Sequence, residues 1–407
     1  MNIKIILIIL FSLKTSYSYS EDVPNVKTMI GNITGKLESN INVFKGIPYA
    51  TPPVGDLRWK KSQPYKKRNT VIEANKFGNV CPQKIFEGYN EEILNNRKMD
   101  EDCLTLNIWS PDLTPKKPKA VMVWFLPGSF LTGDGGMDVY NGIFLAQQDV
   151  VVVTFNYRLG YLGQFAHPVI NKLDPNNAIG NYYLSDQILL LEWVRDNILN
   201  FGGDPSNITI FGMSAGGISV NYLMGLPAAK GLFHKAISQS SSVLPYKAQH
   251  INKAIGQSKS LEDSGLNFSN YFKINDSPKK LLKKIKILNW KKILNYQDIN
   301  PLQSVGPVIG SYYFPDTLGS IFTNGNQYKL PLMLGATSWE GSLLKGLESV
   351  DPLLSRLSVS RKDINYLYGN IDEKSVLNNL YFDIFFGSQR WLAKKHAMAN
   401  LQTYLYH

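Results

Sequence analysis

Histidine and cysteine are scarce in this sequence: its 407 residues include five histidines and two cysteines. A zinc or other transition-metal site needs several such side chains close together, and no histidine pair lies near Cys81 or Cys103. The sequence therefore predicts no metal site. It also lacks internal repeats and low-complexity segments. With 44% hydrophobic and 18% charged residues, it has the composition of a globular protein with a large core and not of a disordered chain.

Long apolar runs are missing as well. Lys4 precedes an apolar run at residues 5–13 that is too short to span a bilayer, and small polar residues follow it. This layout predicts a secretory signal peptide at residues 1–20; the alternative is a buried N-terminal strand. No later run is long enough for a transmembrane helix, so we expect a secreted, extracellular chain without a membrane anchor, and one domain at residues 21–407.

The two cysteines fit an oxidising compartment. Cys81 and Cys103 stand 22 positions apart, which in a secreted chain predicts one disulfide that closes a surface loop. Glycosylation sequons at Asn32 and Asn267 agree with that compartment, whereas the sequon at Asn207 heads a predicted buried strand and is a poorer acceptor.

The formal net charge of +11 is concentrated in one segment. Seven lysines between residues 279 and 292 surround four apolar residues that share one helical face: Leu281, Leu282, Ile285 and Leu288. We interpret these lysines as the solvated side of an amphipathic helix. Binding to nucleic acid or to another acidic surface is the alternative, but no nucleic-acid motif accompanies the charge, so a nucleic-acid partner is not expected.

The apolar pattern favours an α/β fold. Near-continuous apolar runs at residues 120–125 and 150–155 predict strands covered on both faces, and residues 207–211 and 330–335 predict two more. Helices are expected at residues 185–200, with Ser185 as the N-cap, and at about 217–224. Residues 26–60 are typical of antiparallel edge strands. Strands that alternate with helices indicate a mostly parallel central sheet flanked by helices.

A Gly-x-Ser-x-Gly motif stands between the strand at residues 207–211 and the helix that follows it. The motif is Gly212-Met213-Ser214-Ala215-Gly216. A strand that turns sharply into a helix at this point lifts the Ser214 hydroxyl above the sheet and requires small neighbours where backbone segments pass closely. The helix N-terminus then faces developing negative charge. An accidental Gly-Ser turn is the alternative, and the flanking strand and helix argue against it.

Several blocks in a fixed order resemble the carboxylesterase type B and cholinesterase family of α/β-hydrolases. The blocks are FKGIPYA (44–50), PPVGDLRW (52–59), EDCLTLN (101–107), FNYRLG (155–160), residues 180–187 and FGGDP (201–205), which leads to the motif around Ser214. The resemblance runs from about residue 26 to the last residue. It implies the α/β-hydrolase fold, with the last strands and the C-terminal helix of the family missing from this sequence.

The resemblance also assigns roles to individual residues. It implies Ser214 as the nucleophile, Glu340 as the acid that orients a histidine, and backbone N–H donors for an oxyanion hole at Gly128, Ser129 and Ala215. It implies that Cys81 and Cys103 form the family's first disulfide. Structural ion pairs are implied between Arg58 and Glu101 and between Arg158 and Asp186. No cofactor is implied, and the expected partner is a small-molecule ester.

The sequence departs from the family pattern around the site. Residues 126–130 are LPGSF, where the family has a histidine or aromatic residue followed by small residues, so Ser129 places a Cβ where glycine is usual. Met213 replaces an acidic or amide residue, and no tryptophan lies between Cys81 and Cys103. Choline recognition uses such an aromatic ring, so a cholinesterase role is not expected.

The catalytic histidine is also missing. The triad order is serine, acid, histidine, and only His396 and His407 follow Glu340. His396 lies in a helical pattern and His407 follows a strand-like TYLY segment, so neither matches the family's histidine block. We place His167 in a loop, His234 at a helix start and His250 in a helix. The sequence is then either a fragment of a longer protein or a shortened, non-catalytic relative.

Two functions follow. The first is a secreted serine carboxylic ester hydrolase that acts on a neutral, lipophilic ester through an acyl-enzyme and is inactive as written if the base is missing. The alternative is a non-catalytic binding or adhesion protein of the neuroligin type, which the Gly128-Ser129-Phe130 stretch resembles. The presence of Ser214 argues for the first.

Overall fold

The structure is a computed structural model that describes residues 23–407 except 68, 86–90, 95, 178, 243–248, 256–258, 303–305, 312, 315, 341–348, 358 and 400. The expected signal peptide at residues 1–20 lies outside the described residues. The described strands are β1 (Asn25–Thr28), β2 (Gly31–Thr34), β3 (Lys36–Glu38), β4 (Ile41–Pro48), β5 (Ile72–Glu73), β6 (Thr105–Ser110), β7 (Lys119–Phe125), β8 (Val151–Phe155), β9 (Gly203–Met213), β10 (Lys235–Gln239), β11 (Leu332–Gly335) and β12 (Thr403–Tyr406).

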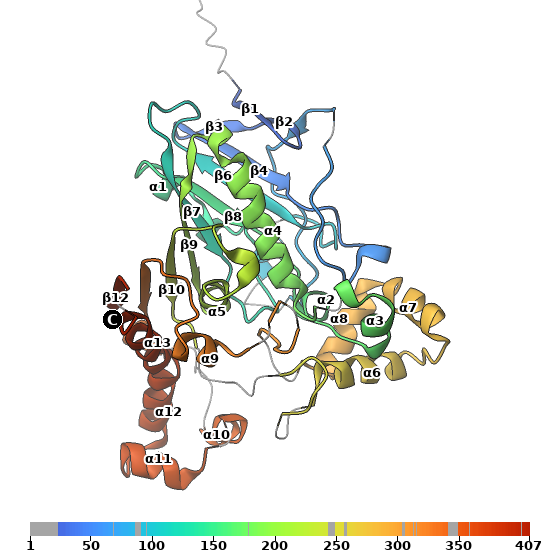
Figure 1. Ribbon diagram of the computed structural model, residues 1–407, viewed down its shortest axis with the longest axis vertical. Coiled ribbons are helices and arrows are strands. Elements are labelled where there is room, and N and C mark those ends of the chain that lie inside the picture. The colour runs from blue at the N-terminus through green and yellow to red at the C-terminus, as the bar shows by residue number, and fades with distance from the viewer. Residues whose placement is uncertain are drawn as a thin grey trace, which may run out of the picture.

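Nine of these strands form one twisted sheet in the order β12-β11-β10-β9-β7-β8-β6-β4-β3 (Figure 1). The strands from β12 to β8 run parallel, and β6, β4 and β3 continue the sheet antiparallel. A small second sheet joins β1, β2 and β5. The mostly parallel α/β fold predicted from the sequence is confirmed, and so are the strands at residues 120–125, 150–155, 207–211 and 330–335.

Helices cover the sheet and extend beyond it. They are α1 (Ile143–Ala146), α2 (Gly160–Gly163), α3 (Pro168–Leu173), α4 (Tyr182–Asn197), α5 (Ala215–Leu223), α6 (Leu261–Tyr271), α7 (Pro278–Lys286), α8 (Trp290–Ile299), α9 (Leu318–Thr323), α10 (Asp351–Leu357), α11 (Arg361–Tyr368), α12 (Glu373–Phe382) and α13 (Ser388–Ala397). In Figure 1, α4 lies across the sheet, α6, α7 and α8 form a lobe at one side, and α10 to α12 project from the lower end. No helix among the described residues is long and apolar enough to cross a membrane.

One helix start differs from the prediction. The N-cap of α4 is Asn181, and Ser185 lies one turn inside the helix, where its hydroxyl donates to the carbonyl of Tyr182 at 2.9 Å. The same Ser185 oxygen accepts from the backbone N–H of Ser62 at 3.1 Å. Serine favours caps when its side chain binds a free helical N–H, but here the hydroxyl has tertiary partners instead. The predicted N-cap was therefore wrong.

The described histidines also differ from two expectations. His234 precedes strand β10 rather than a helix, and its Nδ1 accepts from the Ile208 N–H at 3.1 Å. His250 lies in a β-bridge with Ile309. His396 is buried in α13, with Nε2 2.9 Å from the Leu330 carbonyl. These three histidines therefore lie in three different parts of the fold, each with its own backbone contacts.

His167 is a buried helix cap. Its Nδ1 accepts from the Val169 N–H at 3.1 Å at the start of α3, and its Nε2 lies 3.3 Å from the Ser269 hydroxyl. Burial lowers the pKa of His167 to about 4. The ring is therefore neutral in the folded protein at neutral pH, and it can act as an acceptor at Nδ1.

The predicted disulfide is confirmed: Cys81 and Cys103 are bonded, and both lie in the main core. Replacement of both by alanine is expected to lower the free energy of unfolding by about 3 kcal/mol, because the bond closes a loop with a sequence separation of 22. Denaturant unfolding of the two proteins measures this difference. Reduction of the unaltered protein should give a similar loss, and equal stability of variant and parent would contradict the prediction.

His167 predicts a pH-dependent stability. The unfolded histidine has a pKa near 6.5, whereas the folded one has a pKa of about 4, so below pH 6.5 the unfolded chain binds the extra proton and the folded state loses stability as the pH falls. His167→Gln keeps an acceptor but cannot be protonated, so its free energy of unfolding should fall less between about pH 7 and about pH 5. Urea titrations at both pH values test this; an unchanged pH slope in the variant would show that His167 is not the group responsible.

Candidate active site

The turn at Ser214 joins β9 to α5 in a rarely populated backbone conformation. Ser214 has φ 53° and ψ −118°, outside the usual regions for a residue with a Cβ. A Cβ at Gly212 would stand 2.7 Å from the backbone carbon of Gly216, and one at Gly216 would stand 2.0 Å from the Phe125 carbonyl oxygen. Glycine is therefore needed at both positions, as the sequence motif predicted.

Two hydrogen bonds hold this turn. The Ser214 N–H donates to the Gln239 carbonyl at the end of β10 at 2.8 Å, and the Ile218 N–H donates to the Ser214 carbonyl at 2.8 Å. The Ser214 side chain is half-buried, and its hydroxyl makes no hydrogen bond to a described residue. The hydroxyl is therefore accessible and uncommitted at the carboxyl edge of the parallel strands, where ligands of α/β folds bind.

The loop that carries the candidate oxyanion donors leaves the neighbouring strand. Phe125 at the end of β7 pairs with Gly212 of β9, so residues 126–136 start beside the Ser214 turn. Gly128 has φ 103°, and a Cβ there would lie 2.0 Å from the Thr132 carbonyl oxygen. Ser129 has φ 57°, the left-handed conformation that the glycine-rich pattern of the family implied. A non-glycine residue adopts it at a cost of about 1–2 kcal/mol.

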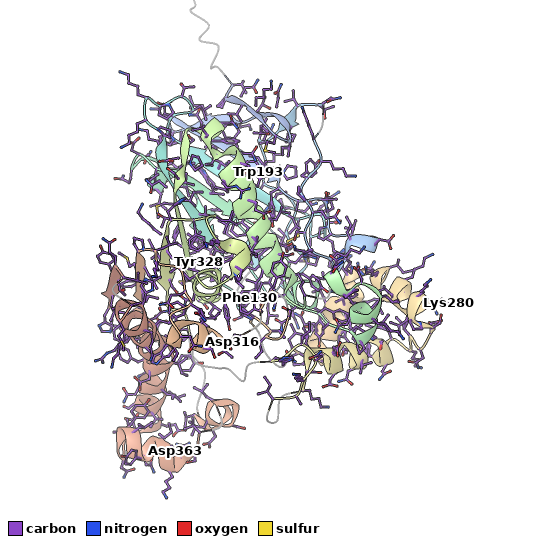
Figure 2. All side chains as sticks on the ribbon, viewed as in Figure 1. Phe130, Trp193, Lys280, Asp316, Tyr328 and Asp363 are labelled. Carbon is purple, nitrogen blue, oxygen red and sulfur yellow. A yellow bond between two sulfur atoms is a disulfide. The ribbon has the colours of Figure 1, made fainter. Side chains whose placement is uncertain are left out.

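Aromatic packing fixes the far end of this loop. Phe130 is buried, and its ring centroid lies 4.7 Å from that of Tyr183. The Tyr157 hydroxyl donates to the Leu126 carbonyl at 2.8 Å, and the Gly160 N–H donates to the Phe130 carbonyl at 2.8 Å. Figure 2 shows Phe130 near the centre of the molecule, between the sheet and the α6–α8 lobe. The loop is therefore held at both ends.

Three backbone N–H groups, two in the loop after β7 and one in the turn after β9, have no described partner. Those of Gly128, Ser129 and Ala215 donate to no described residue, and Ala215 is the first residue of α5. The N-terminal N–H groups of a helix are free for an external acceptor and carry partial positive charge. These three groups are available to a negatively charged oxygen.

Glu340 follows β11 and is buried. Its Oε1 accepts from the Ser240 hydroxyl at 2.7 Å, the Thr337 N–H at 2.9 Å and the Thr337 hydroxyl at 3.0 Å. Ser240 comes directly after Gln239, whose carbonyl accepts from Ser214. Consecutive residues at the end of β10 thus contact the backbone of Ser214 and the carboxylate of Glu340.

Tyr406, at the end of β12, lies within electrostatic range of Glu340. The Tyr406 ring occupies the space over Gly335, where a Cβ would meet it at 2.4 Å. Burial raises the pKa of Tyr406, and the negative charge of Glu340 raises it further. Tyr406 therefore stays neutral beside the carboxylate.

No histidine completes the arrangement. All five lie among the described residues, and none hydrogen bonds to Ser214 or Glu340. His407 adjoins Tyr406, but its ring packs on Phe382 and Phe386, with centroids 5.4 and 4.8 Å away. The described residues therefore bring together a serine, an acid and N–H donors without an imidazole.

Two buried ion pairs brace the surrounding loops. Arg58 binds Glu101 through two contacts, one of which joins Nε to Oε1 at 2.7 Å, and its Nη1 donates to the Leu288 carbonyl at 2.6 Å. The Arg158 Nη2 lies 2.8 Å from the Asp186 Oδ1, and Arg158 Nη1 donates to the Lys60 carbonyl at 3.0 Å. None of these four side chains hydrogen bonds to Ser214, and together they tie the N-terminal loops to α4 and to the segment before α8. Among the described residues, no group of three or more His, Cys, Asp or Glu side chains could hold a metal ion.

Ser240 and the strand before it were not predicted from the sequence. Residues 235–239 are KAISQ, too short and too weakly apolar to predict a buried strand. The polar run Gln239-Ser240-Ser241 was the available signal, because polar residues at the carboxyl end of a parallel strand often line a site. Strand order, which places β10 between β9 and β11, was needed to use it.

Several known proteins are similar to this chain in sequence and in architecture. A model of the carboxylesterase family matches residues 22–374. The chain is 34% identical over 317 residues to the fumonisin B1 esterase of Sphingopyxis macrogoltabida, covering 77% of this chain and 56% of that protein. It is 44% identical over 221 residues to the para-nitrobenzyl esterase of Bacillus subtilis (strain 168), covering 53% of this chain and 43% of that protein.

A solved structure of PNB esterase superposes with a TM-score of 0.76 at 30% identity, covering 94% of this chain and 78% of that one. The chain spans about half the length of the curated relatives it matches. The family model and the structural match each cover most of the chain. The chain therefore belongs to the carboxylesterase family and has its α/β-hydrolase fold.

Proposed function

We propose that this protein is a serine carboxylic ester hydrolase that works through an acyl-enzyme. The observation that carries the proposal is the strained turn at Ser214, which holds an uncommitted hydroxyl beside three free N–H donors. In the reaction, the Ser214 oxygen attacks the ester carbonyl carbon while a base removes the hydroxyl proton. The alcohol leaves with that proton, and water then releases the carboxylic acid from Ser214.

The N–H groups of Gly128, Ser129 and Ala215 would hold the negative oxygen of the tetrahedral intermediate. Such donors act because they are already in place when charge develops, and the loss of one lowers the rate by about 10²–10³. The φ values of Gly128 and Ser129 support this role, because a left-handed backbone turns successive N–H groups toward one side of a loop. Pro127 lacks an N–H but lies before the assigned donors.

Glu340 would orient and stabilise a protonated imidazole. Its Oε1 has three donors, whereas no described residue donates to Oε2, which leaves that oxygen for the imidazole N–H. None of the five histidines of the 407 residues supplies this ring at the site. Without the base, Ser214 keeps the weak nucleophilicity of an ordinary hydroxyl.

The substrate would be a neutral, lipophilic ester. Met213 adjoins the nucleophile and is 41% exposed, so the site entrance carries a thioether where an acid would attract a cation. The buried rings of Phe130, Tyr157 and Tyr183 lie behind the oxyanion loop and add no charge. These features favour an apolar acyl or alkyl group over a cationic one.

Secretion is part of the same proposal. The disulfide between Cys81 and Cys103 suits an oxidising compartment, and the sequon residues Asn32 and Asn267 are both exposed. The asparagine of the third sequon, Asn207, is half-buried, and its Oδ1 accepts from the Lys235 ammonium at 2.5 Å. Asn32 and Asn267 are therefore the acceptors compatible with the folded chain.

Chemical rescue by imidazole tests the site directly. The 407-residue protein is expected to hydrolyse p-nitrophenyl butyrate faster as imidazole is added, with a saturating dependence, because free imidazole can replace the missing base beside Ser214. Ser214→Ala should show only the linear background of imidazole alone. Glu340→Gln should weaken the rescue, because the imidazolium loses its carboxylate. Identical imidazole dependence of parent and Ser214→Ala would contradict the proposal.

The alternative is a non-catalytic binding or adhesion protein. The observation that favours it is the Gly128-Ser129-Phe130 stretch together with five histidines committed elsewhere. A fluorophosphonate probe separates the two functions, because it modifies an activated serine. Absence of label on Ser214 with and without imidazole, under conditions that label a related active esterase, would favour the adhesion function.

A further inference from the structure

The positive charge of the chain is concentrated in the α6–α8 lobe. Residues 273–292 contain eight lysines and one acid, Asp276, so this segment accounts for +7 of the formal net charge of +11. Figure 2 shows Lys280 at the outer tip of the lobe, far from the sheet. A charge of this density at one extremity produces a local positive potential that the rest of the molecule does not offset.

Helix α7 presents its lysines on one side. Leu281 and Ile285 are buried against the protein, and four exposed lysines lie on the opposite side: Lys279, Lys280, Lys283 and Lys284. At 100° per residue these four span an arc of about 140°. Lys286 turns inward instead, and its ammonium donates to the Asp56 carbonyl at 3.0 Å. We call the four exposed lysines the α7 basic face.

Most of this charge is unpaired. Lys284 forms an ion pair with Asp276 at 2.7 Å, whereas Lys279, Lys280 and Lys283 have no ion pair with a described residue. Lys291 and Lys292 follow at the start of α8, both exposed, and neither has a carboxylate partner among the described residues. The single amphipathic helix predicted from the sequence was wrong: the segment forms two helices, α7 and α8, and Leu288 lies between them. Lys286 is buried, whereas the other six lysines of the predicted solvated side are exposed. Solvation alone does not explain why so few acidic partners are present.

An apolar side chain lies within the basic face. Ile287 follows α7 with φ −94° and ψ 0°, close to helical values, and its side chain is 65% exposed. By the helical period it projects between the directions of Lys280 and Lys283. Ile299, at the end of α8 in the same lobe, is also 65% exposed. Transfer of the Ile287 side chain from water into an apolar phase would be favourable.

The combination of unpaired lysines and an exposed apolar side chain favours one class of partner. A sulfated polysaccharide or a nucleic acid would neutralise the lysines but leave Ile287 in a polar surrounding. An anionic bilayer satisfies both, because lysines bind the headgroup phosphates and carboxylates while an apolar side chain enters the boundary of the acyl chains. We propose that the α7 basic face, with Ile287 at its C-terminal end, is a peripheral binding surface for anionic lipid membranes. This inference does not depend on the proposed ester hydrolysis.

Vesicle co-sedimentation tests the surface. The protein is expected to bind vesicles of phosphatidylcholine with phosphatidylserine, to ignore vesicles of phosphatidylcholine alone, and to bind less as sodium chloride is raised. Lys280→Glu with Lys283→Glu should lower the partition coefficient by about tenfold or more, because each lysine near an anionic surface contributes about a fivefold factor. Lys280→Arg with Lys283→Arg should retain binding.

Two further variants serve as controls. Lys116 and Lys117 are exposed in the turn between β6 and β7, and their replacement by glutamate changes the net charge equally, so it should leave binding nearly unchanged. Ile287→Ser should weaken binding most at high salt, where the apolar contact carries a larger share of the affinity. Circular dichroism of each variant confirms that exposed substitutions leave the fold intact.

The vesicle experiments can either support or overturn membrane binding by the α7 basic face. Loss of binding specific to the α7 basic face, with a further loss in Ile287→Ser, supports the proposal. Failure of the parent protein to bind phosphatidylserine vesicles would overturn it, as would equal losses from the α7 and the Lys116/Lys117 charge reversals. Tight binding to heparin without binding to vesicles would assign the lysines to a polysaccharide instead.

Discussion

The close backbone approach at the Ser214 turn is the constraint on which the site depends. Gly216 lies against the Phe125 carbonyl of β7, so the neighbouring strand, the turn and the first residues of α5 fit only without side chains at residues 212 and 216. A serine at φ 53° and ψ −118° costs about 1–3 kcal/mol. The hydrogen bond to Gln239 and the packing of α5 on β7, β9 and β10 offset that cost.

The order of the strands places the other candidate residues beside the Ser214 turn. The loop with Gly128 and Ser129 leaves β7, Ser214 follows β9, Ser240 follows β10 and Glu340 follows β11. These four strands are neighbours in the parallel part of one sheet. Parallel strands end at the same edge, so segments far apart in sequence converge there without long excursions. The arrangement brings Ser214, the loop with Gly128 and Ser129, and Glu340 to one edge of the sheet, where the proposed nucleophile, oxyanion donors and acid would act.

The sequence alone could predict those features that depend on residues close together in the chain. The buried strands at residues 120–125 and 150–155 are continuously apolar, and Gly212 and Gly216 mark the turn. Contacts across the fold could not be predicted in this way. The hydrogen bond from Ser240 to Glu340 joins residues 100 positions apart in the sequence. The N-cap of α4 is Asn181 and not the predicted Ser185, whose hydroxyl is bonded to other groups inside the fold. The exposure of Ile287 among lysines also needed the structure, because the helical pattern alone does not distinguish it from a buried residue.

The central claim is that Ser214 and three backbone N–H groups form one catalytic centre. A crystal structure of the protein after reaction with a diethyl phosphate ester in the presence of imidazole tests this claim most directly. We expect phosphorus bonded to the Ser214 oxygen, with one phosphoryl oxygen within hydrogen-bond distance of the Gly128, Ser129 and Ala215 N–H groups. An adduct at another residue, or a phosphoryl oxygen turned away from all three groups, would contradict it.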